Sequence, residues 1–77
     1  MIPIGQTLTL GNQEGIVCFD ATYNDNYYVN VSIGDDFKIF RVDKDGDGFN
    51  FTLEKNEEVL ANLFSIWLAE GLEDQNG

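Results

Sequence analysis

The sequence predicts an α+β domain, in which a five-stranded antiparallel β-meander carries one C-terminal α-helix packed on one face. The chain has 77 residues, the length of one small domain. Its first two thirds alternate polar and apolar residues in short segments separated by Gly, Asn and Asp, a pattern typical of strands and turns. Its last third has the apolar spacing of a helix. We expect residues 1–72 to form the domain and residues 73–77 to be a frayed acidic tail.

The strands are predicted from strict or near-strict alternation and from their β-branched and aromatic residues. They cover residues 6–10, 16–23, 27–33 and 37–43, and a fifth begins at Phe49. Clusters of Gly, Asn and Asp mark the turns between them. These clusters lie at residues 11–15, 24–26 and 34–36.

The second and third strands are expected to pair through a three-residue loop at 24–26. This loop would place Tyr23 opposite Tyr27, and it separates apolar from polar side chains almost completely. Tyr28 would then lie on the polar face as a sheet-edge residue. Asn26 tolerates the left-handed backbone with which such loops end.

The stretch 43–54 supports two interpretations, and the hairpin is the one we favour. A two-residue turn at Asp45 and Gly46 suits the positive φ angles of tight hairpins. It would place Phe40 opposite Phe51 and gather large apolar side chains on one face of the sheet.

The alternative is a calcium loop of the EF-hand type, with oxygen ligands at the first, third, fifth and twelfth places and Gly at the sixth. Those places hold Asp43, Asp45, Asp47, Glu54 and Gly48. Against this interpretation, Asn50 replaces the usual aliphatic residue at the eighth place, the preceding segment is rich in β-formers, and the sequence contains no second loop. We therefore assign no metal ligand, and calcium binding stays the alternative.

The C-terminal helix is predicted to begin after Asn56, which can cap it, with Glu57 and Glu58 in the first turn. Its apolar stripe has the spacing i, i+3, i+4 and i+7. The stripe consists of Leu60, Leu63, Phe64 and Trp67. Gly71 suits the left-handed residue after a helix, and Leu72 could then contact Trp67.

Further apolar residues widen the helix face beyond this stripe. They are Val59, Ile66 and Leu68. Either a curved sheet wraps the helix, or the flank of Val59 and Ile66 is a partner surface, for example in a homodimer.

The expected core combines the apolar strand positions with the helix stripe. It consists of Leu8, Leu10, Val17, Phe19, Val29, Val31, Phe40, Val42, Phe49, Phe51, Leu53, Leu60, Leu63, Phe64 and Trp67. Truncating Phe64 or Trp67 to Ala is expected to cost about 3–5 kcal/mol.

Composition excludes several classes of function. Fourteen acidic and four basic residues give a net charge of −10, which argues against direct binding of nucleic acid or anionic membranes. The chain has no His and one Cys, so it can form neither a Cys-His pair nor an internal disulfide. The sequence shows no signal-peptide pattern and no apolar stretch of about 20 residues. We expect a cytoplasmic, non-enzymatic protein with no cofactor.

The second half of the chain combines Phe37-Lys-Ile-Phe-Arg-Val, an Asp-rich turn, Phe49-Asn-Phe-Thr-Leu-Glu and the helix from Asn56. In this combination the chain resembles the small acidic bacterial proteins grouped as domain of unknown function 1292. The aromatic strand pair around Tyr27 and Tyr28 is similar too. The chain departs from the family in its shorter connection between the third and fourth strands and its less acidic start. The resemblance implies a cytosolic protein of unassigned function and no known catalytic residues.

Three functions remain open from the sequence. The first is a non-enzymatic adaptor or regulator that binds a protein partner, which the charge and the wide helix face favour. The second is a calcium-responsive module through residues 43–54. The third is a nucleic-acid mimic that presents carboxylates to a basic nucleic-acid-binding protein.

Overall fold

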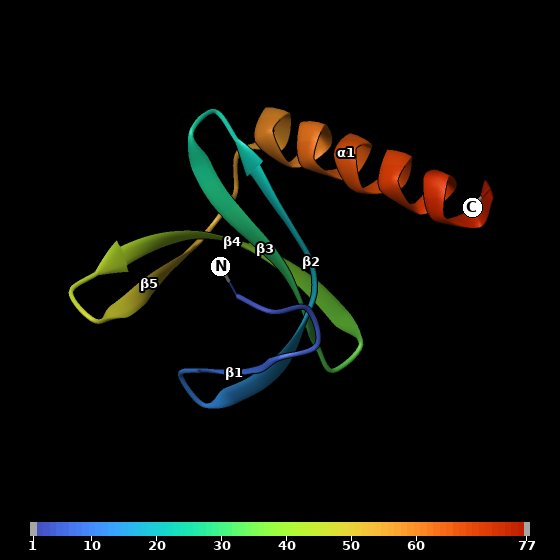
Figure 1. Cartoon of the computed structure of the whole chain (residues 1–77). Coiled ribbons are helices and arrows are strands. Elements are labelled where there is room, and N and C mark those ends of the chain that lie inside the picture. The colour runs from blue at the N-terminus through green and yellow to red at the C-terminus, as the bar shows by residue number, and fades with distance from the viewer. Residues whose placement is uncertain (1, 77) are drawn as a thin grey trace.

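A computed structural model describes the backbone of residues 2–76 and the side chains of residues 2–71. The described residues form one five-stranded sheet and one helix. Figure 1 shows that the sheet is curled and that the helix lies beside it. The elements are β1 (Thr7–Leu10), β2 (Gln13–Tyr23), β3 (Asn26–Ile33), β4 (Asp36–Asp45), β5 (Gly48–Leu53) and α1 (Glu57–Asn76). The strands follow chain order and every neighbouring pair is antiparallel. The predicted fold class is therefore confirmed.

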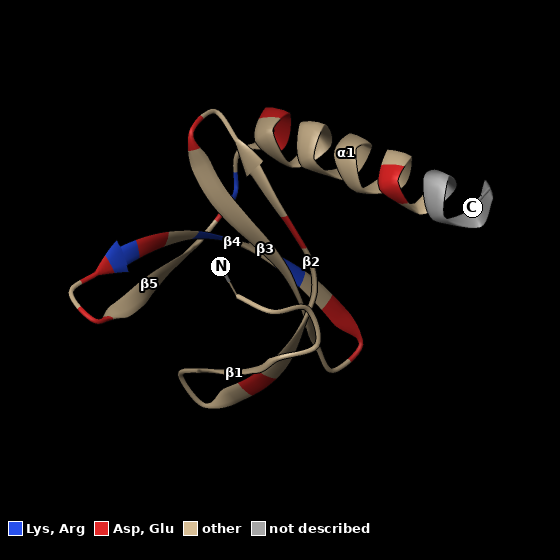
Figure 2. Ribbon diagram, viewed as in Figure 1, with Lys and Arg blue, Asp and Glu red and all other residues tan. Residues whose placement is uncertain are grey.

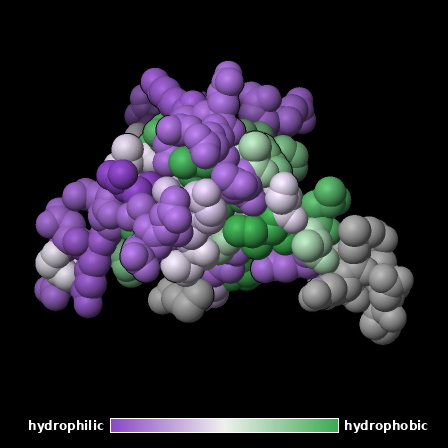
Figure 3. Space-filling view, turned by 90° about the horizontal axis from the view of Figure 1, so that it is seen from above, coloured by the Kyte–Doolittle hydropathy of each residue, from purple (hydrophilic) through white to green (hydrophobic). Residues whose placement is uncertain are grey.

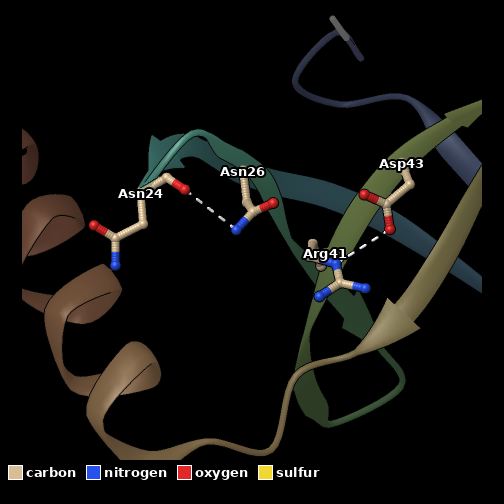
Figure 4. Close-up of polar contacts among 4 residues, drawn as sticks. All are labelled: Asn24, Asn26, Arg41 and Asp43. Atoms are coloured by element: carbon tan, nitrogen blue, oxygen red, sulfur yellow. Dashed lines mark hydrogen bonds and ion pairs between the residues drawn. The ribbon is translucent and has the colours of Figure 1, made fainter.

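Each of the four turns contains two residues. Three of them begin with a glycine in the left-handed region, the arrangement of a type II′ turn. These are Gly11 (φ 64°), Gly34 (φ 60°) and Gly46 (φ 60°). The β2–β3 turn instead has two residues with positive φ, Asn24 (51°) and Asp25 (65°), as type I′ requires. Figure 4 shows the Asn26 side-chain amide donating to the Asn24 carbonyl in this turn, at 3.3 Å.

The predicted three-residue loop at 24–26 is wrong, and the error changes the face on which the β2 side chains from Phe19 to Tyr23 lie. Tyr23 pairs with Asn26, so the register is shifted by one residue from the predicted one. A β-bulge between Val17 and Phe19 then shifts the register again. Because neighbouring residues of a strand point to opposite faces, the bulge places Val17 and Phe19 on different faces.

The predicted turn at Asp45 and Gly46 is also misplaced, but without consequence for the faces. Asp45 pairs with Gly48, and Phe51 lies opposite Val42 rather than opposite Phe40. The shift is two residues, and the side-chain period of a strand is also two. The expected large apolar residues of β4 and β5 therefore still share one face.

The sheet buries a hydrophobic cluster on each of its two faces. The first, which we call the aliphatic face, is built from β-branched residues, with Ile2 of the N-terminal segment packed on them. Its buried members are Ile2, Val17, Val29, Val31 and Val42. The second, which we call the helix face, is the one that α1 covers. Its buried members are Tyr28, Ile39, Leu63 and Trp67.

The N-terminal segment is held on the aliphatic face by hydrogen bonds to β2 and β3. Gly5 N donates to the Val17 carbonyl at 2.7 Å, and Ile2 N donates to the Tyr27 hydroxyl at 3.1 Å. That hydroxyl donates in turn to Asp20 Oδ2 at 2.7 Å. Burial raises the pKa of Tyr27, and the bond to Asp20 raises it further. The segment thus closes the curled sheet on the side without a helix.

The expected core is correct for the valines, Leu63 and Trp67, and wrong for three phenylalanines and Leu53. Phe19, Phe49, Leu53 and Phe64 are between 40% and 51% exposed. Tyr28, placed by the prediction on a polar sheet-edge face, is 3% exposed. Tyr28 is buried because α1 packs on the face opposite to the valines, where Tyr28 lies.

The beginning of α1 is as predicted and its end is not. Asn56 Oδ1 accepts hydrogen bonds from Glu58 N at 2.9 Å and Val59 N at 3.3 Å, which is an N-cap. The helix continues past Gly71 to Asn76, so the expected end at Gly71 is wrong. The predicted contact of Leu72 with Trp67 lies outside the described side chains, and the solvation of residues 73–77 stays a prediction.

Gly15 lies inside β2 rather than in a turn, because β2 begins at Gln13. A Cβ atom there would lie 2.8 Å from Ile33 Cγ1 and closer still to Val31 Cγ1. The aliphatic face is therefore packed against backbone at this point, and a larger residue would have to displace the Val31 and Ile33 side chains. Within residues 2–76, no helix is long and apolar enough to cross a membrane.

Candidate binding groove

A hydrophobic groove of about 490 Å³ opens between α1 and the helix face of the sheet. This volume lies within the roughly 300–1,000 Å³ of typical ligand pockets. The lining comes from β2, β3, β4 and α1. It consists of Phe19, Asn30, Phe37, Phe64, Trp67, Leu68 and Gly71. Figure 3 shows apolar side chains gathered along α1 toward its C-terminal end, whereas hydrophilic side chains cover the other end of that view.

The groove exists because α1 covers only part of the helix face. The beginning of α1 is joined to the end of β2 near the β2–β3 turn, where Asn62 Nδ2 donates to the Tyr23 hydroxyl at 2.9 Å. Figure 1 shows the helix leaving the sheet obliquely, so that its C-terminal half projects beyond the strands. The part of the helix face toward the opposite end of β2 is therefore left without a helix above it.

Trp67 forms the wall where helix and sheet meet. Its indole Nε1 donates to the Asp20 carbonyl at 3.0 Å. Its ring lies 5.9 Å from that of Phe19 and 6.0 Å from that of Phe64, centroid to centroid. These separations are favourable for aromatic pairs. Since Trp67 is hydrogen-bonded and 5% exposed, this wall is a fixed part of the fold.

The rim of the groove carries large side chains that are poorly covered. Phe37 is 63% exposed, Leu68 is 67% exposed and Phe64 is 51% exposed. Phe64 and Leu68 lie four residues apart on α1, so they project from one side of the helix. A group of large exposed apolar side chains around a hollow is typical of an interaction site.

Asn30 lies in the floor of the groove, on the central strand β3. Its side chain is 5% exposed, and its Oδ1 atom is buried with no hydrogen-bond partner among the described residues. Burying an unpaired polar atom costs about 1–3 kcal/mol, and few such atoms occur in native proteins. The groove therefore combines apolar walls with one buried acceptor that lacks a donor.

The register of the β2–β3 hairpin determines the composition of this floor. Because the turn has two residues, Phe19 pairs with Asn30. Asn30 pairs with Ile39 on the next strand. The predicted register placed Asp20 opposite Asn30 on a polar face instead. Alternation along single strands does not reveal this register, so it does not identify Asn30 and Phe37 as site residues. A signal was present in the apolar residues Phe37 and Ile39, which lie on the other face of β4 from Phe40 and Val42.

Of the two explanations for the wide apolar face of α1, packing on the curled sheet accounts for Val59 and Ile66. Val59 and Ile66 pack against the cluster of Tyr28, Leu63 and Trp67. The flank that α1 leaves exposed is the opposite one, with Phe64 and Leu68.

The stretch 43–54 folds as a hairpin, as favoured from the sequence, and its acidic residues have separate local roles. Asp43 Oδ2 accepts from Arg41 Nε at 3.1 Å, which Figure 4 shows as an ion pair along β4. Asp45 Oδ2 accepts from the Asn50 side chain at 3.3 Å. Within the described residues, no group of three or more His, Cys, Asp or Glu side chains is placed to hold a metal ion.

Glu54 lies at the junction between β5 and α1. Its Oε2 accepts from Lys55 N at 3.1 Å and Asn56 N at 3.4 Å, which fixes the backbone before the helix cap. Burial raises the pKa of the Tyr28 hydroxyl, and the negative charge of Glu54 raises it further. The residue expected at the twelfth place of a calcium loop thus belongs to the connection between sheet and helix.

Acidic residues surround the molecule at its turns and at the start of α1, as Figure 2 shows. Asp25, Asp35 and Asp47 each occupy a turn between strands. None of the four basic residues is among the residues that line the groove. The groove is therefore apolar inside an acidic surface.

Comparison with protein-family models, curated proteins and solved structures finds no match for this chain. The resemblance to domain of unknown function 1292 stays a prediction.

Proposed function

We propose that this chain is a non-enzymatic binding protein that recognises a protein partner through the groove between α1 and the sheet. The observation that carries the proposal is the group of exposed Phe37, Phe64 and Leu68 side chains around an apolar hollow. A partner that covers these side chains removes apolar surface from water, which is the main favourable term in protein association.

The exposed rim favours a macromolecule over a small ligand. A small molecule in the hollow would leave the outer parts of Phe37 and Leu68 in water, whereas a protein surface covers hollow and rim together. The net charge of −10 favours a partner other than a second copy, because two copies would bring like charges together.

Two exposed phenylalanines provide a matched test. Phe37 is 63% exposed at the groove, and Phe49 is 48% exposed on the β4–β5 hairpin. The variants Phe37→Ser and Phe49→Ser change the same side chain at exposed positions, so both are expected to fold. Each protein, with the unchanged chain, is immobilised and used to recover partners from an extract of the source cells.

We expect a partner that the unchanged chain and Phe49→Ser both retain and that Phe37→Ser loses. The purified partner is then titrated by calorimetry, with at least a tenfold weaker affinity expected for Phe37→Ser. Equal recovery by Phe37→Ser would refute binding through the groove. Sedimentation of the chain alone tests the homodimer: a dimer that Phe37→Ser dissociates would make the partner a second copy and would contradict the proposal.

A further inference from the structure

We infer that the groove receives a basic amphipathic segment of the partner, which inserts an aromatic side chain bearing an N–H group toward Asn30. This inference rests on the proposed function and specifies the chemistry of the partner. It follows from three features of the groove: the unpaired acceptor in its floor, the aromatic walls around that acceptor, and the acidic surface around the rim.

The acceptor requires a hydrogen-bond donor from outside the chain. Asn30 Oδ1 is buried and has no partner among the described residues, and a carbonyl oxygen can only accept. A binding site built to form such a bond discriminates strongly against ligands that lack the donor, because its own polar atom is then left unpaired. The occupant therefore carries an N–H or O–H group.

The walls restrict what can carry that donor. Phe19 and Phe64 lie beside Trp67 at 5.9 and 6.0 Å, and Phe37 and Leu68 extend from the rim. A strongly hydrated group such as an ammonium would lose its water in this setting without a charged partner. An indole suits both requirements, because it is a large apolar ring with a single N–H donor.

The acidic residues around the groove indicate which residues flank that aromatic side chain in the partner segment. Asp35, in the β3–β4 turn, lies two residues before Phe37, and Glu70 immediately precedes Gly71; both are exposed. No Lys or Arg lines the groove. Lysine or arginine flanking the aromatic anchor would therefore meet carboxylates at the rim and would speed association. A helix with apolar anchors spaced three or four residues apart is a common way to fill such a groove.

Small aromatic molecules test the donor separately from the peptide. Indole and benzothiophene have nearly the same size and shape, but only indole has an N–H group. Each is titrated into the full chain and followed by amide NMR. We expect indole to bind about three- to tenfold more tightly, with shifts at Phe19, Asn30 and Phe37. Equal affinities, or shifts confined to the aliphatic face, would overturn the inference.

The variant Asn30→Leu tests the acceptor, since leucine has a similar size and no polar atom. We expect it to fold with an unchanged or higher melting temperature and to abolish the preference for indole. A preference that persists in folded Asn30→Leu would overturn the assignment of Asn30. If this variant does not fold, the comparison of indole with benzothiophene on the unchanged chain still decides the question.

Three synthetic peptides test the whole segment. The first is a 12-residue amphipathic peptide with one central tryptophan and four lysines, the second has phenylalanine in place of tryptophan, and the third has glutamate in place of lysine. We expect the first to bind most tightly, with an affinity that falls as salt is added. Equal binding of all three would contradict the inference. If the cellular partner still depends on Phe37, the proposed function stands and only this chemistry fails.

Discussion

The two faces of the sheet are built differently, and the difference shows where recognition can occur. The aliphatic face buries β-branched residues against one another, and the N-terminal segment closes it with Ile2. The helix face is aromatic, and α1 covers only part of it, leaving the groove and the unpaired Asn30 Oδ1. A closed cluster contributes stability alone, whereas an incompletely covered one with a buried acceptor can gain further contacts from a partner.

The largest expected effect is a difference in unfolding free energy between two truncations in α1, Trp67→Ala and Phe64→Ala. The sequence alone predicts the same cost for both. Trp67→Ala should cost about 3–5 kcal/mol of unfolding free energy, because the ring is buried and its Nε1 bond to Asp20 is lost. Phe64→Ala should cost only about 1 kcal/mol, since roughly half of that side chain already faces water. Urea denaturation measures both. Equal losses would mean that Phe64 is core and that the groove is closed.

A smaller change in stability is expected when glycine is replaced by alanine at two positions. Gly15 lies on the tightly packed aliphatic face, and Gly71 lies at the open groove. Gly15→Ala forces a methyl group against Val31 and Ile33 and should cost about 1–3 kcal/mol. Gly71→Ala has free space and lies within α1, so it should stabilise by about 0.5–1 kcal/mol. Thermal melts at pH 7 give the sign of each change. A destabilised Gly71→Ala would instead support the helix end that the sequence predicted there.

The smallest expected effect is a loss of stability at high pH, to which one tyrosine on each face of the sheet contributes. Burial raises the pKa of both Tyr27 and Tyr28 above the ordinary value near 10. The unfolded chain therefore releases these protons first, so stability is complete below about pH 10 and falls as the pH rises through the higher folded values. In denaturation midpoints measured from pH 8 to 12, Tyr28→Phe and Tyr27→Phe should each weaken this fall. An unchanged pH profile in both variants would contradict the assignment.

Much of the fold could be predicted because its signals are local. Alternation predicted all five strands, glycine with asparagine or aspartate marked the turns, and Asn56 with the following glutamates marked the start of α1. Each of these depends on backbone preferences or on contacts within a few residues. The same reasoning favoured a hairpin over a calcium loop at 43–54, because alternation continues on both sides of the turn.

Sequence alone determined the class of fold, the acidic surface and the existence of an apolar helix, because composition and periodicity carry this information. Only the tertiary structure decided which face of the sheet the helix covers. The side chains of β2 on each face depend on two features of its pairing with β3. The two-residue turn sets Phe19 opposite Asn30, and the bulge between Val17 and Phe19 puts Val17 on the other face. Turn length and bulges are not visible in residue patterns along single strands, so the groove and Asn30 could not be predicted from them.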